Sequence, residues 1–315
     1  MIDEGLARLA DNLFWTALVV YAVAMLVYFY SLAYRRARAS TIATVIAWGG
    51  ALTHIASVAS RGLSAGRVPW GNMFEYSSMI GLLIVLAYLV IIDARMKLRA
   101  LGGFVMGAGV LSLASARFVY APAGPLVPAL NSYWLKIHVI AAITGSMLFG
   151  LSFIFTALYF LKDRAERRTS TFAGSTVGAA SLIGERVVSD LDDEETGAGP
   201  SDVAPGGLLA RLPSATRLDT LALRTIQFAF PIWTFAVMAG AVWAHEAWGR
   251  YWGWDPKETW AFITWVVYAG YLHARSTAGW RGRRSAIISA VGFGCVLFTY
   301  FAVNLWISGL HSYAK

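Results

Sequence analysis

The chain has 315 residues, of which 57% are hydrophobic and only 14% are charged. Soluble domains carry about 25% charged residues, so this composition excludes both an ordinary water-soluble enzyme and a disordered chain. The formal charge of +8 would suit a nucleic-acid partner. However, the basic residues lie between apolar runs, as they do in loops beside membrane spans, so we expect no nucleic-acid partner. The single cysteine, Cys295, lies inside an apolar run and leaves no disulfide, CxxC pair or cysteine metal site.

Eight apolar segments approach the length of about 20 residues that a helix needs to cross a bilayer. The predicted fold is therefore all-α, a polytopic membrane helix bundle with about eight transmembrane helices. In chain order the predicted spans cover about 12–31, 41–60, 74–92, 98–117, 134–161, 223–244, 259–275 and 285–307.

The basic residues orient these spans. They gather in alternate connections, and the positive-inside rule makes those connections cytoplasmic. The N- and C-termini are then both outside. The residues that define the inner side are Arg35, Arg36, Arg38, Arg95, Lys97, Arg99, the cluster 162–168, Arg275, Arg281, Arg283 and Arg284.

The chain divides into three parts. Residues 1–161 hold the first five spans, and residues 223–315 hold the last three with an external Trp-rich segment at 243–260. Residues 162–222 form a cytoplasmic connection whose stretch DLDDEETGAGPSDVAPGG, acidic and rich in Gly and Pro, predicts a flexible linker without chemistry. Asp219 is the predicted N-cap of the next helix, and Pro231 is predicted to kink it.

Tryptophan is concentrated in the last outer connection, since residues 243–260 hold five of the 13 tryptophans in the chain. One interpretation is an interfacial aromatic belt. The indoles alternate with Gly, Asp, Pro and Glu, which favours instead a shaped platform for a flat ligand. The platform would comprise Trp243, Trp248, Trp252, Trp254, Asp255 and Trp260, with Lys257 and Glu258 available to orient the ligand or to contact an incoming protein.

The five histidines are the second functional signal. His138 lies near the start of a span and His311 just beyond the last span, so both are expected near the outer face. His54 and His273 lie within spans, where an ionisable residue is a functional-site hypothesis. Imidazole pairs without cysteine or carboxylate companions suit haem iron, whereas zinc sites usually have three or four protein ligands. The pattern therefore points to haem.

Several stretches of the sequence resemble one family. WGRYWGWDPKETWAFITW is similar to the tryptophan-rich "WWD" signature of the haem-handling cytochrome c biogenesis proteins of the CcsA/ResC (CcsB-type) family. VPWGNMFEYSSM, NSYWLKIHV, YLHAR and NLWISGLHSY fit the same family, so the resemblance covers nearly the whole chain.

The resemblance implies a ligand set. His138 and His311 match the family's two external haem-ligating histidines, and His54 and His273 match its two histidines within the membrane. His245 stands where the family more often has Asn, and we expect it to take that polar role rather than to bind iron. Haem b would be the bound cargo.

The resemblance also implies a function, namely haem export to the extracytoplasmic face of the plasma membrane and attachment to the CxxCH thiols of apocytochrome c (System II maturation). The chain would be a subunit of a cytochrome c synthase, or haem lyase, without a catalytic group beyond haem positioning. It would act with a ResB-type membrane partner and, indirectly, with thiol-reducing proteins. Two alternatives stay open: a haem-bearing electron-transfer subunit, and a small-solute transporter with histidine proton relays.

Overall fold

The computed structural model describes residues 2–126, 130–184, 207–307 and 309–310, with the backbone alone over 169–184. Within these ranges the chain is helical and has no strand, which confirms the predicted all-α class. The long helices are α1 (Glu4–Tyr34), α2 (Ala37–Ala65), α3 (Met73–Ala87), α4 (Gly102–Phe118), α5 (Tyr133–Gly184), α6 (Ala215–Trp248), α7 (Pro256–Ser276) and α8 (Arg283–Leu305). A π-helix extends α3 over Tyr88–Asp93, and single 3-10 turns occupy Arg99–Leu101 and Leu208–Arg211.

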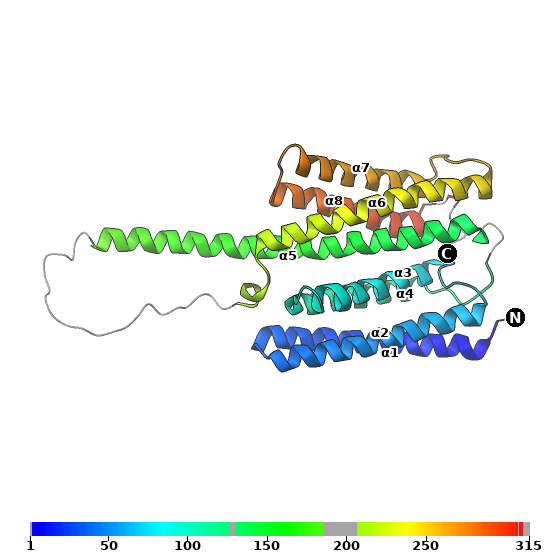
Figure 1. Ribbon diagram of the computed structural model, residues 1–315, viewed down its shortest axis with the longest axis horizontal. Coiled ribbons are helices and arrows are strands. Elements are labelled where there is room, and N and C mark those ends of the chain that lie inside the picture. The colour runs from blue at the N-terminus through cyan, green and yellow to red at the C-terminus, as the bar shows by residue number, and fades with distance from the viewer. Residues whose placement is uncertain (1, 127–129, 185–206, 308, 311–315) are drawn as a thin grey trace.

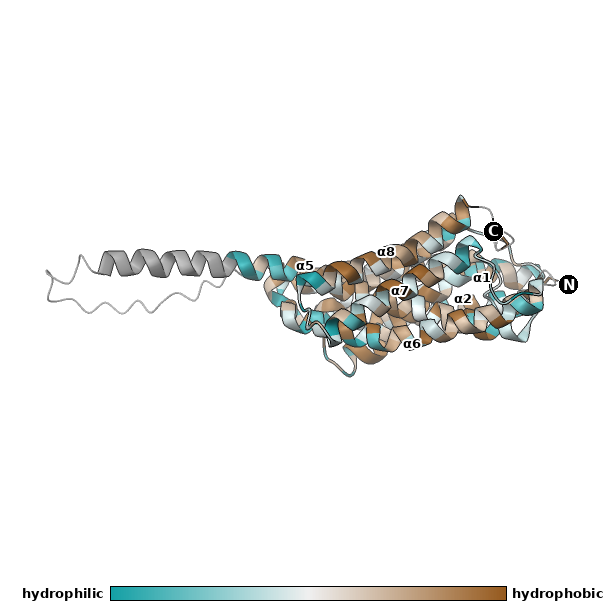
Figure 2. Ribbon diagram, turned by 90° about the horizontal axis from the view of Figure 1, so that it is seen from above, coloured by the Kyte–Doolittle hydropathy of each residue, from teal (hydrophilic) through white to brown (hydrophobic). Residues whose placement is uncertain are grey.

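Each predicted span coincides with one of these helices. Seven of the helices in the described ranges are long and apolar enough to cross a membrane. The helix that falls short is α7, because its Trp, Tyr, Thr and His residues lower its mean hydropathy. It nevertheless lies alongside α6 and α8 in Figure 1, and hydrophobic residues cover the length of the bundle in Figure 2. The chain is therefore a multi-pass membrane protein.

The helices are arranged in pairs across the bundle (Figure 1). α1 and α2 lie at one side, α3 and α4 come next, α5 and α6 follow, and α7 and α8 lie at the opposite side. The start of α1, the end of α8 and the connections 66–72, 119–126 and 249–255 gather at one end of the bundle. The distribution of basic residues predicts that this end is the outer one, and we call it the outer end.

Small residues allow α1 and α2 to pack closely. Ala43, Ala47 and Ala51 recur every fourth residue on α2 and are fully buried, as are Ala17 and Ala24 on α1. In a bilayer, helix association depends on such close packing, because lipid is as apolar as the side chains. The spacing of small residues therefore determines which face of α2 meets α1.

Two local predictions differ from the structure. Ser214 caps α6, since its side chain accepts a hydrogen bond from the backbone N–H of Arg217, and the helix begins at Ala215. Asp219 is therefore not the N-cap, and its carboxylate pairs at 2.8 Å with Arg275 of α7. Because α5 continues to Gly184, the beginning of the predicted linker 162–222 is helical, and residues 185–206 lie outside the described ranges.

The orientation of the bundle is testable by labelling single cysteines in a Cys295→Ala background. Pro122→Cys lies in the outer connection 119–132, and Arg281→Cys lies between α7 and α8. Both positions are exposed. We expect a membrane-impermeant maleimide to label Pro122→Cys in intact cells and Arg281→Cys only after permeabilisation. The reverse pattern would contradict the orientation.

Candidate functional site

A cavity of about 790 Å³ lies within the bundle, and its walls come from α3, α4, α5, α6, α7 and α8. Its volume falls within the range of about 300–1,000 Å³ that is typical of small-molecule sites. Most of the wall is apolar. The residues that line the outer part of the cavity include Trp70, His138, Trp243, Trp252, Lys257 and Glu258.

His138 is held in this wall by α6. Its Nδ1 lies 2.8 Å from the backbone carbonyl oxygen of Ala236. A carbonyl oxygen can only accept, so Nδ1 carries the proton and Nε2 carries the lone pair that a metal would require. The Trp243 ring stacks on the imidazole at 6.2 Å between centroids and 10° between planes. A Cβ added to Gly240 would lie 2.8 Å from two ring atoms, so glycine leaves the space that the imidazole occupies.

The tryptophans of the outer segment divide into two groups. Trp243 is buried and Trp252 is half-buried in the cavity wall, and Trp248 packs edge-on against Trp243 at 4.8 Å. Trp254 is 65% exposed and adopts a left-handed backbone conformation with φ 58°. Trp260 packs against Phe298 of α8 at 3.9 Å between centroids. The structure therefore brings Trp243 and Trp252 to the cavity with His138, and directs Trp254 and Trp260 elsewhere.

Asp255 joins two segments that are distant in the sequence. It caps α7, with its Oδ1 accepting from the backbone N–H of Lys257 at 3.2 Å and with Glu258 completing a capping box. Its Oδ2 accepts from the backbone N–H of Leu310 at 2.7 Å. A Cβ on Gly309 would lie only 2.6 Å from the same oxygen. Asp255 thus connects the start of α7 to Leu310, the residue directly before His311. His311 lies outside the described residues.

Most of the other polar groups of residues 243–260 stabilise the fold of this segment. Glu258 Oε2 accepts from the backbone N–H groups of Gly253 and Asp255 at 2.8 and 3.1 Å, and Arg250 Nη1 lies 3.6 Å away. The guanidinium of Arg250 occupies the space where a Cβ on Gly253 would be. Lys257 differs from these residues because its side chain faces the cavity. Burial lowers the pKa of Lys257 to about 8.

The remaining predicted histidines do not line the cavity. His54 is fully buried, with Nδ1 3.3 Å from the Tyr21 hydroxyl and Nε2 2.8 Å from the Ser78 hydroxyl. His273 is exposed in the last turn of α7, with Nδ1 3.5 Å from the Thr277 hydroxyl. Because α2 and α7 lie at opposite sides of the bundle (Figure 1), these two histidines are not brought together.

His245 also lies away from the cavity wall. It is exposed in the last turn of α6 and stacks on Tyr251, with 4.3 Å between centroids and 8° between planes. Its ring is therefore engaged at the surface of the segment 243–260.

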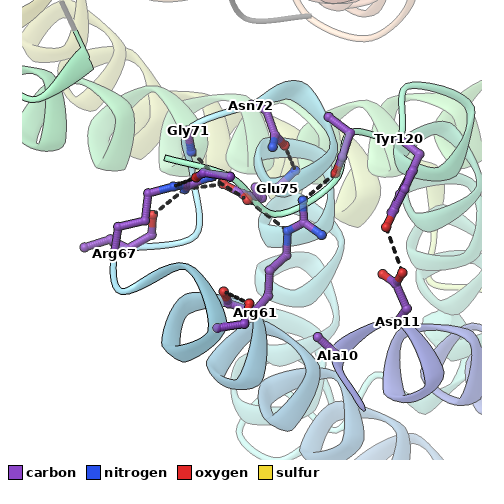
Figure 3. Close-up of polar contacts among 12 residues, drawn as sticks. Ala10, Asp11, Arg61, Arg67, Gly71, Asn72, Glu75 and Tyr120 are labelled. Carbon is purple, nitrogen blue, oxygen red and sulfur yellow. Dashed lines mark hydrogen bonds and ion pairs between the residues drawn. The ribbon is translucent and has the colours of Figure 1, made fainter. Parts of the chain in front are cut away.

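A buried ion cluster centred on Glu75, which the sequence analysis did not single out, braces the outer rim of the cavity (Figure 3). Its carboxylate is 1% exposed and lies 2.8 Å from both Arg61 Nε and Arg67 Nη1. It also accepts from the backbone N–H of Gly71 at 2.7 Å. The Asn72 side chain caps α3 by accepting from the Glu75 backbone N–H at 2.9 Å. Gly71 and Asn72 themselves line the cavity.

The same arginines hold the connection between α4 and α5. Arg61 donates to the carbonyl of Ala121 at 2.5 Å, and Arg67 Nε donates to the carbonyl of Gly124 at 2.8 Å. In Figure 3, Tyr120 of this connection reaches Asp11 of α1, and its hydroxyl donates to that carboxylate at 2.7 Å. Further along, Leu126 packs against the group that includes Leu130 and Trp243. The cluster therefore fixes a loop that continues to the wall of the cavity.

The fold and this cavity define a class of polytopic membrane protein with an elongated cavity, whose lining extends from Leu161 of α5 to Trp70 at the outer end. A family model described as cytochrome c assembly protein matches residues 70–311. The chain is 36% identical over 329 residues to the cytochrome c biogenesis protein CcsA of Gloeobacter violaceus, covering 97% of this chain and 95% of that protein. It is 38% identical over 276 residues to CcsA of Synechococcus elongatus (82% of each) and 35% identical over 305 residues to CcsA of Porphyra purpurea (92% of each).

The chain therefore belongs to the cytochrome c assembly protein family and is of the CcsA type, which confirms the resemblance seen in the sequence. Among solved structures, it is similar to the cytochrome c haem lyase CcmF, with a TM-score of 0.64 and 15% identity. The match covers 94% of this chain and 46% of that one. At this identity the likeness shows the fold alone.

Glu75→Gln should destabilise the protein strongly, because it leaves two buried guanidinium groups without their counter-charge. Breaking a buried ion pair from one side typically costs about 3–5 kcal/mol. The measurement is the free energy of unfolding of the purified protein in mixed micelles. Glu4→Gln is the matched control, since its partner Arg8 and Glu4 itself are 80% and 83% exposed, and it should leave the stability unchanged. Equal stability of the two variants would contradict the bracing role of the cluster.

Proposed function

We propose that this chain holds haem in the outer part of the cavity and presents it for covalent attachment to apocytochrome c. The observation that carries the proposal is the hydrogen bond from His138 Nδ1 to the carbonyl of Ala236, because it sets the tautomer in which Nε2 carries the lone pair that iron would bind. The aromatic rings of Trp243 and Trp252 in the wall of this outer part suit a planar macrocycle.

His311 is the proposed second axial ligand. The support for this role is the contact between Asp255 and Leu310, because Leu310 directly precedes His311 in the sequence. Asp255 would then act as a positioning residue that holds the C-terminal segment near the tryptophans. Two histidine ligands would fill both axial positions and exclude oxygen from the iron.

The attachment step needs no base or metal from this chain. Each thiol of the CxxCH motif adds across one vinyl group, so that a sulfur–carbon bond forms, the thiol hydrogen ends on the neighbouring carbon and no net electrons are transferred. Holding a vinyl group beside a thiol makes the reaction effectively unimolecular, which is the contribution expected of the protein. The histidine of CxxCH would then replace one axial ligand and release the product.

The finer parts of the function are proposals of the same kind. Attachment would take place at the extracytoplasmic face of the plasma membrane, with a ResB-type partner and with thiol reductants that prepare the substrate. His54 already contacts Tyr21 and Ser78. Since α2 and α7 lie at opposite sides of the bundle, a haem bound by the exposed His273 would need a second ligand other than His54.

His138→Ala should lose the haem that co-purifies with the wild type, and added imidazole should restore it by filling the vacated coordination position. The measurement is the haem absorption spectrum of the detergent-solubilised protein, together with cytochrome c maturation in the same cells. His245→Ala is the matched control, because this exposed ring does not line the cavity. An unchanged haem content in His138→Ala would refute the assignment.

Gly240→Ala should weaken haem binding without removing any ligand, because the new methyl group would lie 2.8 Å from the His138 ring and displace it. We expect a loss of at least tenfold in haem affinity, about 1.4 kcal/mol, measured by titration of the apoprotein. Gly270→Ala is the control, since a Cβ at that position on α7 has no neighbour within 4 Å. Equal affinities for the two variants would show that the position of the ring does not matter.

A further inference from the structure

Lys257 presents a positive charge to an otherwise mostly apolar wall. Its side chain is half-buried and lines the cavity beside Trp252. Within the part of the chain that the structure describes, its ammonium group makes no hydrogen bond or ion pair, although its backbone N–H bonds to Asp255. A partly desolvated ammonium is costly unless an anion accompanies it. The cavity therefore contains a charge that favours an anionic ligand.

The nearby carboxylates of Asp255 and Glu258 bind groups other than the Lys257 ammonium group through three of their four oxygens. Asp255 accepts from Leu310 and caps α7, so its oxygens are directed at backbone N–H groups. Glu258 Oε2 accepts from two backbone N–H groups and lies near Arg250, whereas its buried Oε1 has no hydrogen-bond partner among the described residues. The groups that the other elements contribute to this end of the cavity, including His138 on α5, Tyr251 of the loop and Tyr300 on α8, are not carboxylates. The cavity beside Lys257 thus suits a ligand that directs one carboxylate at the ammonium group.

We propose that Lys257 binds a propionate carboxylate of the haem and so sets the orientation of the ring, an inference that rests on the proposed function. The two propionates of haem lie on the edge opposite its two vinyl groups. A ring whose propionate edge is held at Lys257 therefore turns its vinyl edge away from Lys257, to the opposite side of the iron. His138 fixes the iron, and Lys257 selects among the rotations of the ring about the iron–nitrogen bond.

The test compares haem with its dimethyl ester, in which both propionates are uncharged. Dissociation constants are measured by absorption titration of the full-length apoprotein in detergent, for the wild type, Lys257→Met, Lys257→Arg and the control Lys136→Met. Lys136 is exposed on α5 and does not line the cavity. We expect the wild type, Lys136→Met and Lys257→Arg to bind haem about tenfold more tightly than the ester. Lys257→Met should bind the two porphyrins equally, with its affinity for the ester unchanged.

Three outcomes would overturn the inference in different ways. If Lys257→Met retains the tenfold preference while His138→Ala loses haem, the propionate contact is wrong and the proposed function stands. If Lys257→Met binds haem and the ester more weakly than the wild type by the same factor, Lys257 contributes to folding and not to recognition of the propionate. If the wild type binds neither porphyrin, or if His138→Ala binds both as the wild type does, the proposed function and the inference fail together.

Discussion

The packing of α5 against α6 is the constraint on which the site depends. Three residues of α6, spaced four and three residues apart and therefore on one face, control the ring of His138. The backbone carbonyl of Ala236 accepts a hydrogen bond from the His138 ring, Gly240 leaves room for the ring and Trp243 stacks on it. A small rotation of α6 would change all three contacts at once. The same two helices join the α1–α4 side of the bundle to the α7–α8 side (Figure 1), so the ligand position is set where the two sides meet.

The outer connections are stabilised by buried carboxylates at helix N-termini. Glu75 lies in the first turn of α3, and Asp255 is the N-cap of α7. A negative charge at such a position interacts favourably with the helix dipole and with the unsatisfied N–H groups. Each carboxylate also holds a second segment. Glu75 binds the arginines that fix the connection 119–132, and Asp255 binds the C-terminal segment at Leu310. Two outer connections and the segment at Leu310 therefore meet around the cavity.

The sequence was sufficient to predict the helices and the position of His138 near the start of one of them, because both follow from long apolar runs. The sequence alone could not predict that Trp243 and Trp252 line the cavity while Trp254 and Trp260 do not. This difference depends on how residues 243–260 fold over the bundle. The carboxylate of Asp255 was predicted to be part of a ligand platform, whereas it binds backbone N–H groups.

The features that the sequence did not predict depend mainly on contacts between residues that are distant in the chain. Glu75 lies in the stretch VPWGNMFE, and nothing local indicates that Arg61 and Arg67 converge on it. Asp219 was predicted as a cap because its residue type suits that role, but Ser214 precedes it and Arg275 of α7 engages its carboxylate. His54 and His273 share a residue type and a place within predicted spans, yet they belong to helices at opposite sides of the bundle.

The most direct test of the central claim is a cryo-electron microscopy map of the haem-loaded protein with its membrane partner. We predict density for a haem in the cavity between α5, α6 and α7, with its iron coordinated by Nε2 of His138 and its propionate edge facing Lys257. Iron bound elsewhere in the chain, with the cavity beside His138 empty, would contradict this account.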